Sequence, residues 1–114
     1  MQQGRFLGLD LGAETLKMVE LTVDAAGARV TGRRLIEHGK DPVGALRRAL
    51  AASSPATVTG AAATGRGSRA LALPRVPTKA ALKAGVRFAH PDLMPVTVVS
   101  IGSHGFQVLE LRDQ

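Results

Sequence analysis

Apolar and polar positions alternate in the first third of the chain, and this pattern predicts three short strands. Residues 5–10 form an apolar run that ends in an acid, and residues 14–23 carry apolar side chains on both faces of a second strand. Residues 28–37 alternate most regularly. Gly27 punctuates a turn before them, so we expect a meander whose second and third strands are antiparallel.

The apolar spacing becomes helical after residue 41. Asp41 is a favourable N-cap residue, and Pro42 suits the first helical position that follows it. Apolar residues then recur at helical spacing until a Ser-Ser-Pro segment at 53–55 ends the helix. Residues 57–63 are small and apolar, which is typical of a buried central strand, and a glycine-rich loop follows at 64–69.

The last third of the chain predicts a second helix and a terminal hairpin. Thr78 is a candidate N-cap for a helix over residues 79–89. Residues 96–101 are strongly apolar, residues 102–105 turn the chain, and residues 106–111 return. The predicted order is βββ-α-β-α-ββ, an α/β fold with a mixed sheet of about five strands.

The composition excludes several kinds of site. The chain has 114 residues, a net charge of +6 and no Cys, which rules out a disulfide scaffold, a thiolate metal site and an iron–sulfur cluster. Three Phe without Trp or Tyr leave almost no stacking platform for single-stranded nucleic acid, and the basic residues are scattered, so nucleic acid is an unlikely partner.

The sequence carries no signal for a membrane or for secretion. No apolar run is long enough for a membrane span, and Asp10 interrupts the first apolar stretch. We therefore expect a cytoplasmic protein. His38, His90 and His104 share no metal-ligand spacing, and each is expected to be a surface or turn histidine.

The segment from Asp10 to Lys17 is a candidate phosphate-binding turn between two strands. Gly12 would let an anion approach the backbone closely. Asp10 at a strand end suits a hydrated Mg²⁺, and Lys17 offers a positive charge to a phosphate oxygen. An ordinary β-turn with a solvated Asp and Lys accounts for these residues equally well.

Three sequence blocks resemble a known family. They are GLDLGAETLKMVEL at 8–21, AATGRGSR at 62–69 and FAHPDLMPVTVVSIGSHGFQVLEL at 88–111. Together they are similar to the N-terminal part of the ATP-dependent activators (activases) of 2-hydroxyacyl-CoA dehydratases and benzoyl-CoA reductases. These activators belong to the superfamily of actin, sugar kinases and heat-shock-chaperone ATPases, and the blocks follow the family's order over nearly the whole chain.

The resemblance implies an RNase H-like, actin-like ATPase lobe that binds ATP or ADP with Mg²⁺. Asp10 matches the family's acid that places Mg²⁺ and water, which makes it the candidate catalytic residue and metal ligand through water. The positions that match the family's nucleotide-binding residues are Asp10, Gly12, Thr15, Lys17, Gly65 and Gly102.

The second hairpin departs from the family pattern. Ser100 stands where the family has an acid, and Gln107 replaces a lysine. An acid that orients the attacking water is therefore absent, and the resemblance implies ATP binding without deciding ATP hydrolysis. The resemblance further implies that residues 1–114 form a single lobe, in which residues 96–112 correspond to the start of a second lobe. The family's cluster-binding cysteines have no counterpart here.

These observations support hypotheses about function from different classes. The first is an activase-like ATPase lobe, incomplete or degenerate, whose partner would be a CoA-ester dehydratase or reductase. The alternative is a non-catalytic interaction module that keeps the fold, with residues 106–111 as an edge strand that forms a homodimer by strand swapping. A basic nucleic-acid binder ranks last, because the chain lacks clustered carboxylates for two-metal cleavage.

Overall fold

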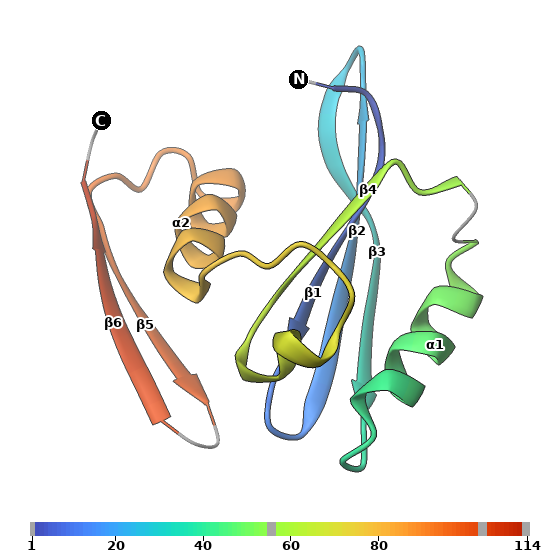
Figure 1. Ribbon diagram of the computed structural model, residues 1–114. Coiled ribbons are helices and arrows are strands. Elements are labelled where there is room, and N and C mark those ends of the chain that lie inside the picture. Colours follow the sequence, from blue (N-terminus) through green and yellow to red (C-terminus); the bar gives the residue numbers. More distant parts are fainter. Residues whose placement is uncertain (1, 55–56, 103–104, 113–114) are drawn as a thin grey trace. The chain divides into compact units, whose positions relative to one another are not determined.

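The computed structural model describes residues 2–54, 57–102 and 105–112. The chain divides into two compact units, Met1–Val76 and Pro77–Gln114. Figure 1 shows the elements of each unit in chain order. The predicted order of strands and helices is confirmed, with one short 3₁₀ helix added after the fourth strand.

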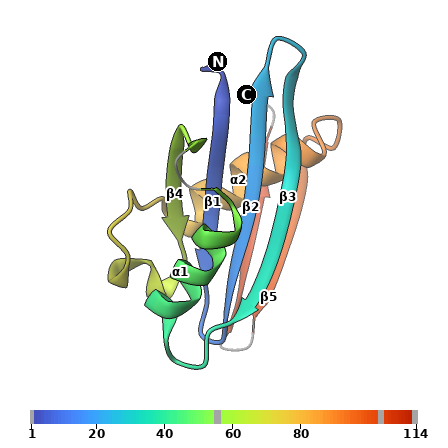
Figure 2. The same ribbon diagram turned by 90° about the vertical axis from the view of Figure 1, so that its right-hand side faces the viewer.

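The first unit is built on a four-stranded mixed sheet in the order β3-β2-β1-β4 (Figure 2). Strands β1 (Gly4–Leu11), β2 (Thr15–Asp24) and β3 (Gly27–Glu37) form the predicted antiparallel meander. Strand β4 (Gly60–Thr64) pairs with β1 in parallel. The predicted sheet of about five strands is wrong in this respect, because the last hairpin forms a sheet of its own.

Helix α1 (Pro42–Ala52) covers one face of this sheet, as Figure 2 shows. The alternation along β1 sends its leucines to that face, where they meet Ala45 and Ala49 of the helix. The helix begins as predicted, because the Asp41 side chain accepts a hydrogen bond of 3.0 Å from the Gly44 N–H. The core consists of Leu7, Leu9, Leu11, Leu16, Met18, Ala45, Ala49, Ala63 and Leu71.

Arg5 on β1 ties the sheet to the segment that follows α1. Its guanidinium donates to the Glu20 carboxylate at 3.0 Å and to the Ser53 carbonyl and the Thr57 hydroxyl. The hydrogen bond from Arg5, assisted by one from Thr31, holds the pKa of Glu20 below its usual value. Charge-assisted bonds therefore fix this end of the sheet.

The second unit contains helix α2 (Thr78–Ala89) and the antiparallel hairpin of β5 (Val96–Gly102) and β6 (Gly105–Leu111). Arg87 on α2 donates to the Arg112 carbonyl at 3.4 Å, which links the helix to the end of the hairpin. Thr78 is the first helical residue rather than the cap, since Pro77 occupies the N-cap position. No helix in the described part of the chain is long and apolar enough to cross a membrane.

Candidate functional site

One end of the four-stranded sheet brings together Asp10, Lys17 and Thr64. Asp10 is the register partner of Lys17 on β2 and of Thr64 on β4. Register partners project from the same face of a sheet, so these three side chains share a face. Their neighbours Leu11, Leu16 and Ala63 are buried on the other face, under α1, so the alternation directs the acid and the lysine away from the core.

The charged groups at this end of the sheet are available to a ligand. Asp10 is half-buried and Lys17 is exposed. The ion pairs found among the described residues join other groups, so neither the Asp10 carboxylate nor the Lys17 ammonium is neutralised by a salt bridge within the described chain. A carboxylate and an ammonium on one face can receive a hydrated cation and a phosphate oxygen side by side.

The turn between β1 and β2 consists of Gly12, Ala13 and Glu14. It is closed by the Gly12 N–H, which donates to the Thr15 carbonyl at 2.9 Å. The predicted close approach of an anion at Gly12 therefore cannot use its own N–H. Ala13 and Glu14 are exposed residues, and no backbone hydrogen bond between described residues uses their N–H groups. These two amides are therefore the ones of the turn that can donate to a ligand.

Gly65 follows β4 and presses directly against the end of β1. Its φ of +95° lies in a region that residues with side chains rarely adopt. A Cβ there would come within 2.4 Å of the Leu11 carbonyl and 2.7 Å of the Asp10 carboxylate. Only glycine lets the chain pass so close to the acid.

The predicted glycine-rich loop at 64–69 is partly helical. The 3₁₀ helix η2 (Arg66–Ala70) starts directly after Gly65, and the Ser68 hydroxyl donates back to the Gly65 carbonyl at 2.7 Å. A Cβ on Gly67 would lie 2.7 Å from the Leu11 side chain. Both glycines are therefore required for the close packing of this segment against β1.

The structure brings most of the predicted site residues together and leaves one apart. The residues that converge in the first unit are Asp10, Gly12, Thr15, Lys17 and Gly65. Gly102 belongs to the second unit, where it is the register partner of Gly105. The turn residues 103 and 104, including the histidine considered above, lie outside the described residues.

The donor set fits a magnesium ion carried by a nucleotide. No group of three or more His, Asp or Glu side chains that could hold a metal occurs among the described residues. Mg²⁺ in nucleotide sites is commonly held by one or two carboxylates, waters and the phosphates themselves. Asp10, which lies beside the Gly65 backbone, can supply such a carboxylate.

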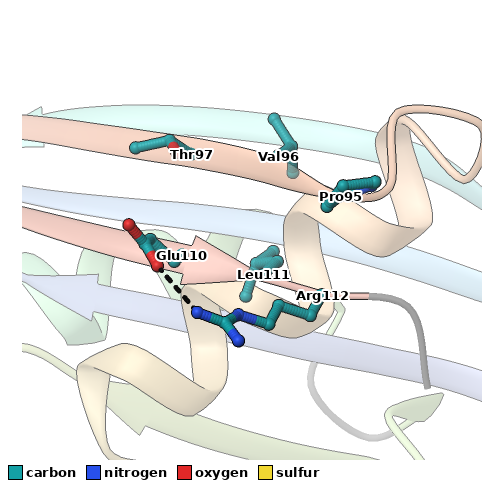
Figure 3. Close-up of a pocket in the computed structure, with 6 residues that line it drawn as sticks. All are labelled: Pro95, Val96, Thr97, Glu110, Leu111 and Arg112. Carbon is teal, nitrogen blue, oxygen red and sulfur yellow. Dashed lines mark ion pairs between the residues drawn. The ribbon is translucent and has the colours of Figure 1, made fainter.

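An open pocket in the second unit has different chemistry (Figure 3). It contains the ion pair of Arg112 and Glu110, whose closest atoms are 3.5 Å apart and well exposed to solvent. It is lined by Pro95, Val96, Thr97, Glu110, Leu111 and Arg112. None of the predicted site residues lines it.

His38 was expected to be a surface or turn histidine; it begins a turn, closed by the Asp41 N–H on its carbonyl, but it is buried rather than on the surface. His38 is only 8% exposed, and its Nε2 lies 3.0 Å from the Gly12 carbonyl oxygen at the candidate turn. Local sequence patterns do not reveal this contact, because the two residues lie 26 positions apart in the chain. The one available signal was its place directly after the third strand.

The chain has an actin-like ATPase fold, as solved structures similar to it show. One is component A of (R)-2-hydroxyglutaryl-CoA dehydratase from Acidaminococcus fermentans, with a TM-score of 0.77 and 20% identity over 96% of this chain. Another is the activator of 2-hydroxyisocaproyl-CoA dehydratase from Clostridium difficile with bound ADPNP, with a TM-score of 0.70 and 21% identity over 93% of this chain.

The likeness extends to a different class of enzyme. The Ppx/GppA phosphatase of Aquifex aeolicus matches 96% of this chain at 13% identity with a TM-score of 0.63. This chain spans 43% of the length of component A, 40% of the activator and 48% of the phosphatase. No protein-family model and no curated protein sequence matches the chain. The predicted RNase H-like fold and the resemblance to the activators are confirmed at the level of the fold.

Proposed function

We propose that this chain is a nucleotide-binding lobe of an activase-like ATPase and that Mg·ATP or Mg·ADP binds at the turn between β1 and β2. One observation carries the proposal. Asp10 and Lys17 are register partners on one face of the sheet, and Gly65 brings the backbone of the neighbouring strand against the Asp10 carboxylate. Ligands of open α/β sheets commonly bind at such carboxyl ends of parallel strands.

Each residue has a part in this proposal. Lys17 supplies positive charge to a phosphate oxygen, and the Ala13 N–H donates a hydrogen bond to it. Asp10 holds Mg²⁺ through water, and Thr15 contributes a hydroxyl beside the turn. The bound Mg·ATP would supply a phosphoryl group whose charge the metal neutralises. These residues support the binding of a nucleotide. They do not supply the acid that orients the attacking water, since Ser100 stands where the resemblance places it.

The similar structures support a partner class as well. Two of them are described as a component or an activator of a CoA-ester dehydratase, and one of these carries a nucleotide analogue. We propose that this chain serves an enzyme of that class. Residues 96–112 would be the counterpart of the second phosphate hairpin, with Gly102 in its turn. A homodimer through β6 stays a prediction that light scattering can test.

Calorimetric titration of Mg·ATP and Mg·ADP into the full chain tests the nucleotide site. Replacement of Asp10 by Asn removes a charge-assisted interaction, so the dissociation constant should rise by about 10- to 100-fold. Asp92→Asn is the matched control, because Asp92 is exposed in the second unit. Binding that Asp10→Asn leaves unchanged, or no binding at millimolar nucleotide, would contradict the proposal.

A further inference from the structure

The buried His38 connects two parts of the first unit that are distant in sequence. It follows β3, and its backbone N–H donates to the Glu14 carbonyl at 3.0 Å. Its ring lies against the same turn, with Nε2 3.0 Å from the Gly12 carbonyl oxygen. Backbone and side chain of one residue thus contact both ends of the turn between β1 and β2.

The hydrogen bonds assign the ring proton. Nδ1 accepts a hydrogen bond of 3.1 Å from the Lys40 N–H, so Nδ1 carries no proton. The proton therefore sits on Nε2, which donates to the Gly12 carbonyl. Both ring nitrogens are satisfied by backbone groups, and this fixes the plane of the ring.

The segment after His38 is a tight turn that is joined to the ring by a hydrogen bond. Gly39 and Lys40 both have positive φ, at 53° and 64°, in a turn closed by the Asp41 N–H, which donates to the His38 carbonyl at 2.7 Å. A lysine rarely adopts this conformation, and it persists only where neighbours hold it. The His38 ring and the N-cap of α1 provide those neighbours.

We propose that His38 is a positioning residue for the phosphate-binding turn. The C=O and N–H of one trans peptide unit point in opposite directions. Because His38 draws the Gly12 carbonyl toward the interior, the Ala13 N–H of the same peptide unit must face away from the fold, where a phosphate oxygen can accept from it. The inference rests on the proposed function, since it assigns a residue that prepares that site.

Two variants separate the two hydrogen bonds of the ring. His38→Asn places an amide oxygen near the position of Nδ1, so it can accept from the Lys40 N–H but is too short to reach Gly12. His38→Gln places an amide N–H near the position of Nε2, so it can donate to the Gly12 carbonyl. His90→Asn is the control, because His90 is exposed in the second unit.

Two readouts are measured on the full chain: the amide hydrogen exchange of Gly12 without nucleotide, and the affinity for Mg·ADP. With His38→Asn we expect exchange about tenfold faster and binding about tenfold weaker, the effect of roughly one lost hydrogen bond. With His38→Gln we expect both within about threefold of the wild type, as rescue by the restored donor. Urea unfolding of both variants separates these effects from global stability.

The outcomes are distinct. Equal effects of the Asn and Gln variants, or unchanged exchange at Gly12 in both, would overturn the role of His38. If the wild type binds no Mg·ADP but the Asn variant still exchanges faster than the Gln variant, the proposed function fails while the hold of His38 on the turn is supported. Faster exchange without weaker binding would overturn the positioning role.

Discussion

The hairpin of β1 and β2 and the hairpin of β5 and β6 have the same register around their turns, yet they differ in chemistry. Asp10 is paired with Lys17 in the first, and Ser100 is paired with Gln107 at the equivalent place in the second. A glycine follows two positions after the first member of each pair: Gly12 after Asp10, and Gly102 after Ser100. The first hairpin therefore carries a charged pair where the second carries a neutral one.

The two hairpins differ as much in packing. Leu11 and Leu16, partners across the first hairpin, are each 1% exposed, whereas the equivalent Ile101 and Phe106 are 81% and 76% exposed. The first hairpin is enclosed by β3, β4 and α1, while β5 and β6 form a sheet of two edge strands. Neighbouring elements, and not the register alone, determine whether a turn is fixed well enough to hold a ligand.

Substitution of Leu16 tests the difference in packing with the largest expected effect. Leu16→Ala removes a fully buried side chain from the core and should lower the free energy of unfolding by about 2–5 kcal/mol. Phe106→Ala at the equivalent position removes an exposed ring and should change it by only about 0.5 kcal/mol. Urea unfolding measures both, and similar losses for the two variants would contradict the packing described here.

Gly65, which packs against the first hairpin, and Gly102, which ends β5 in the second, give the next largest contrast. Gly65→Ala forces a side chain into positive φ and against the Leu11 carbonyl, so we expect a loss of about 1–3 kcal/mol. Among the described residues, a Cβ on Gly102 meets no atom closer than 3.8 Å, so Gly102→Ala should be tolerated. Thermal unfolding of both variants compares them, and a Gly65→Ala protein as stable as the wild type would show that the chain does not press against Asp10.

The smallest expected effect is the pH dependence of Glu20. Because Arg5 lowers its pKa from the ordinary 4.5, Glu20 stabilises the folded state fully above about that pH, and the contribution is lost as the pH falls through the lower folded-state pKa. Glu20→Gln should therefore destabilise the chain at pH 7 and have less effect near pH 3. Glu110→Gln in the exposed second hairpin is the control, and an equal pH dependence in both variants would contradict this assignment.

The features that could be predicted from the sequence are those that depend on residues close together in the chain. The meander, the cap of α1 by Asp41 and the turn between Asp10 and Lys17 all follow from local periodicity and spacing, and each is present. Contacts between distant segments were not predictable in this way. The pairing of His38 with Gly12 and the separation of the last hairpin from the main sheet depend on how strands associate, which periodicity does not encode.

The site was predicted in part for the same reason. Residue types and spacing identified Asp10 and Lys17 as a candidate pair, and the register shows that they share a face. The local pattern gave no sign that the Gly12 N–H is used within the turn or that Gly65 touches the Asp10 carboxylate. Those contacts arise from the closing of the turn and from the parallel pairing of β1 with β4.

The central claim is that the first hairpin, and not the second, receives the phosphates of a nucleotide. An amide-resolved NMR titration of the full chain with Mg·ATP tests it most directly. We predict chemical-shift changes at residues 12–17 and 64–67 that saturate with one dissociation constant and are lost in Asp10→Asn. Changes confined to residues 100–107, or a spectrum that Mg·ATP leaves unaltered at millimolar concentration, would contradict the claim.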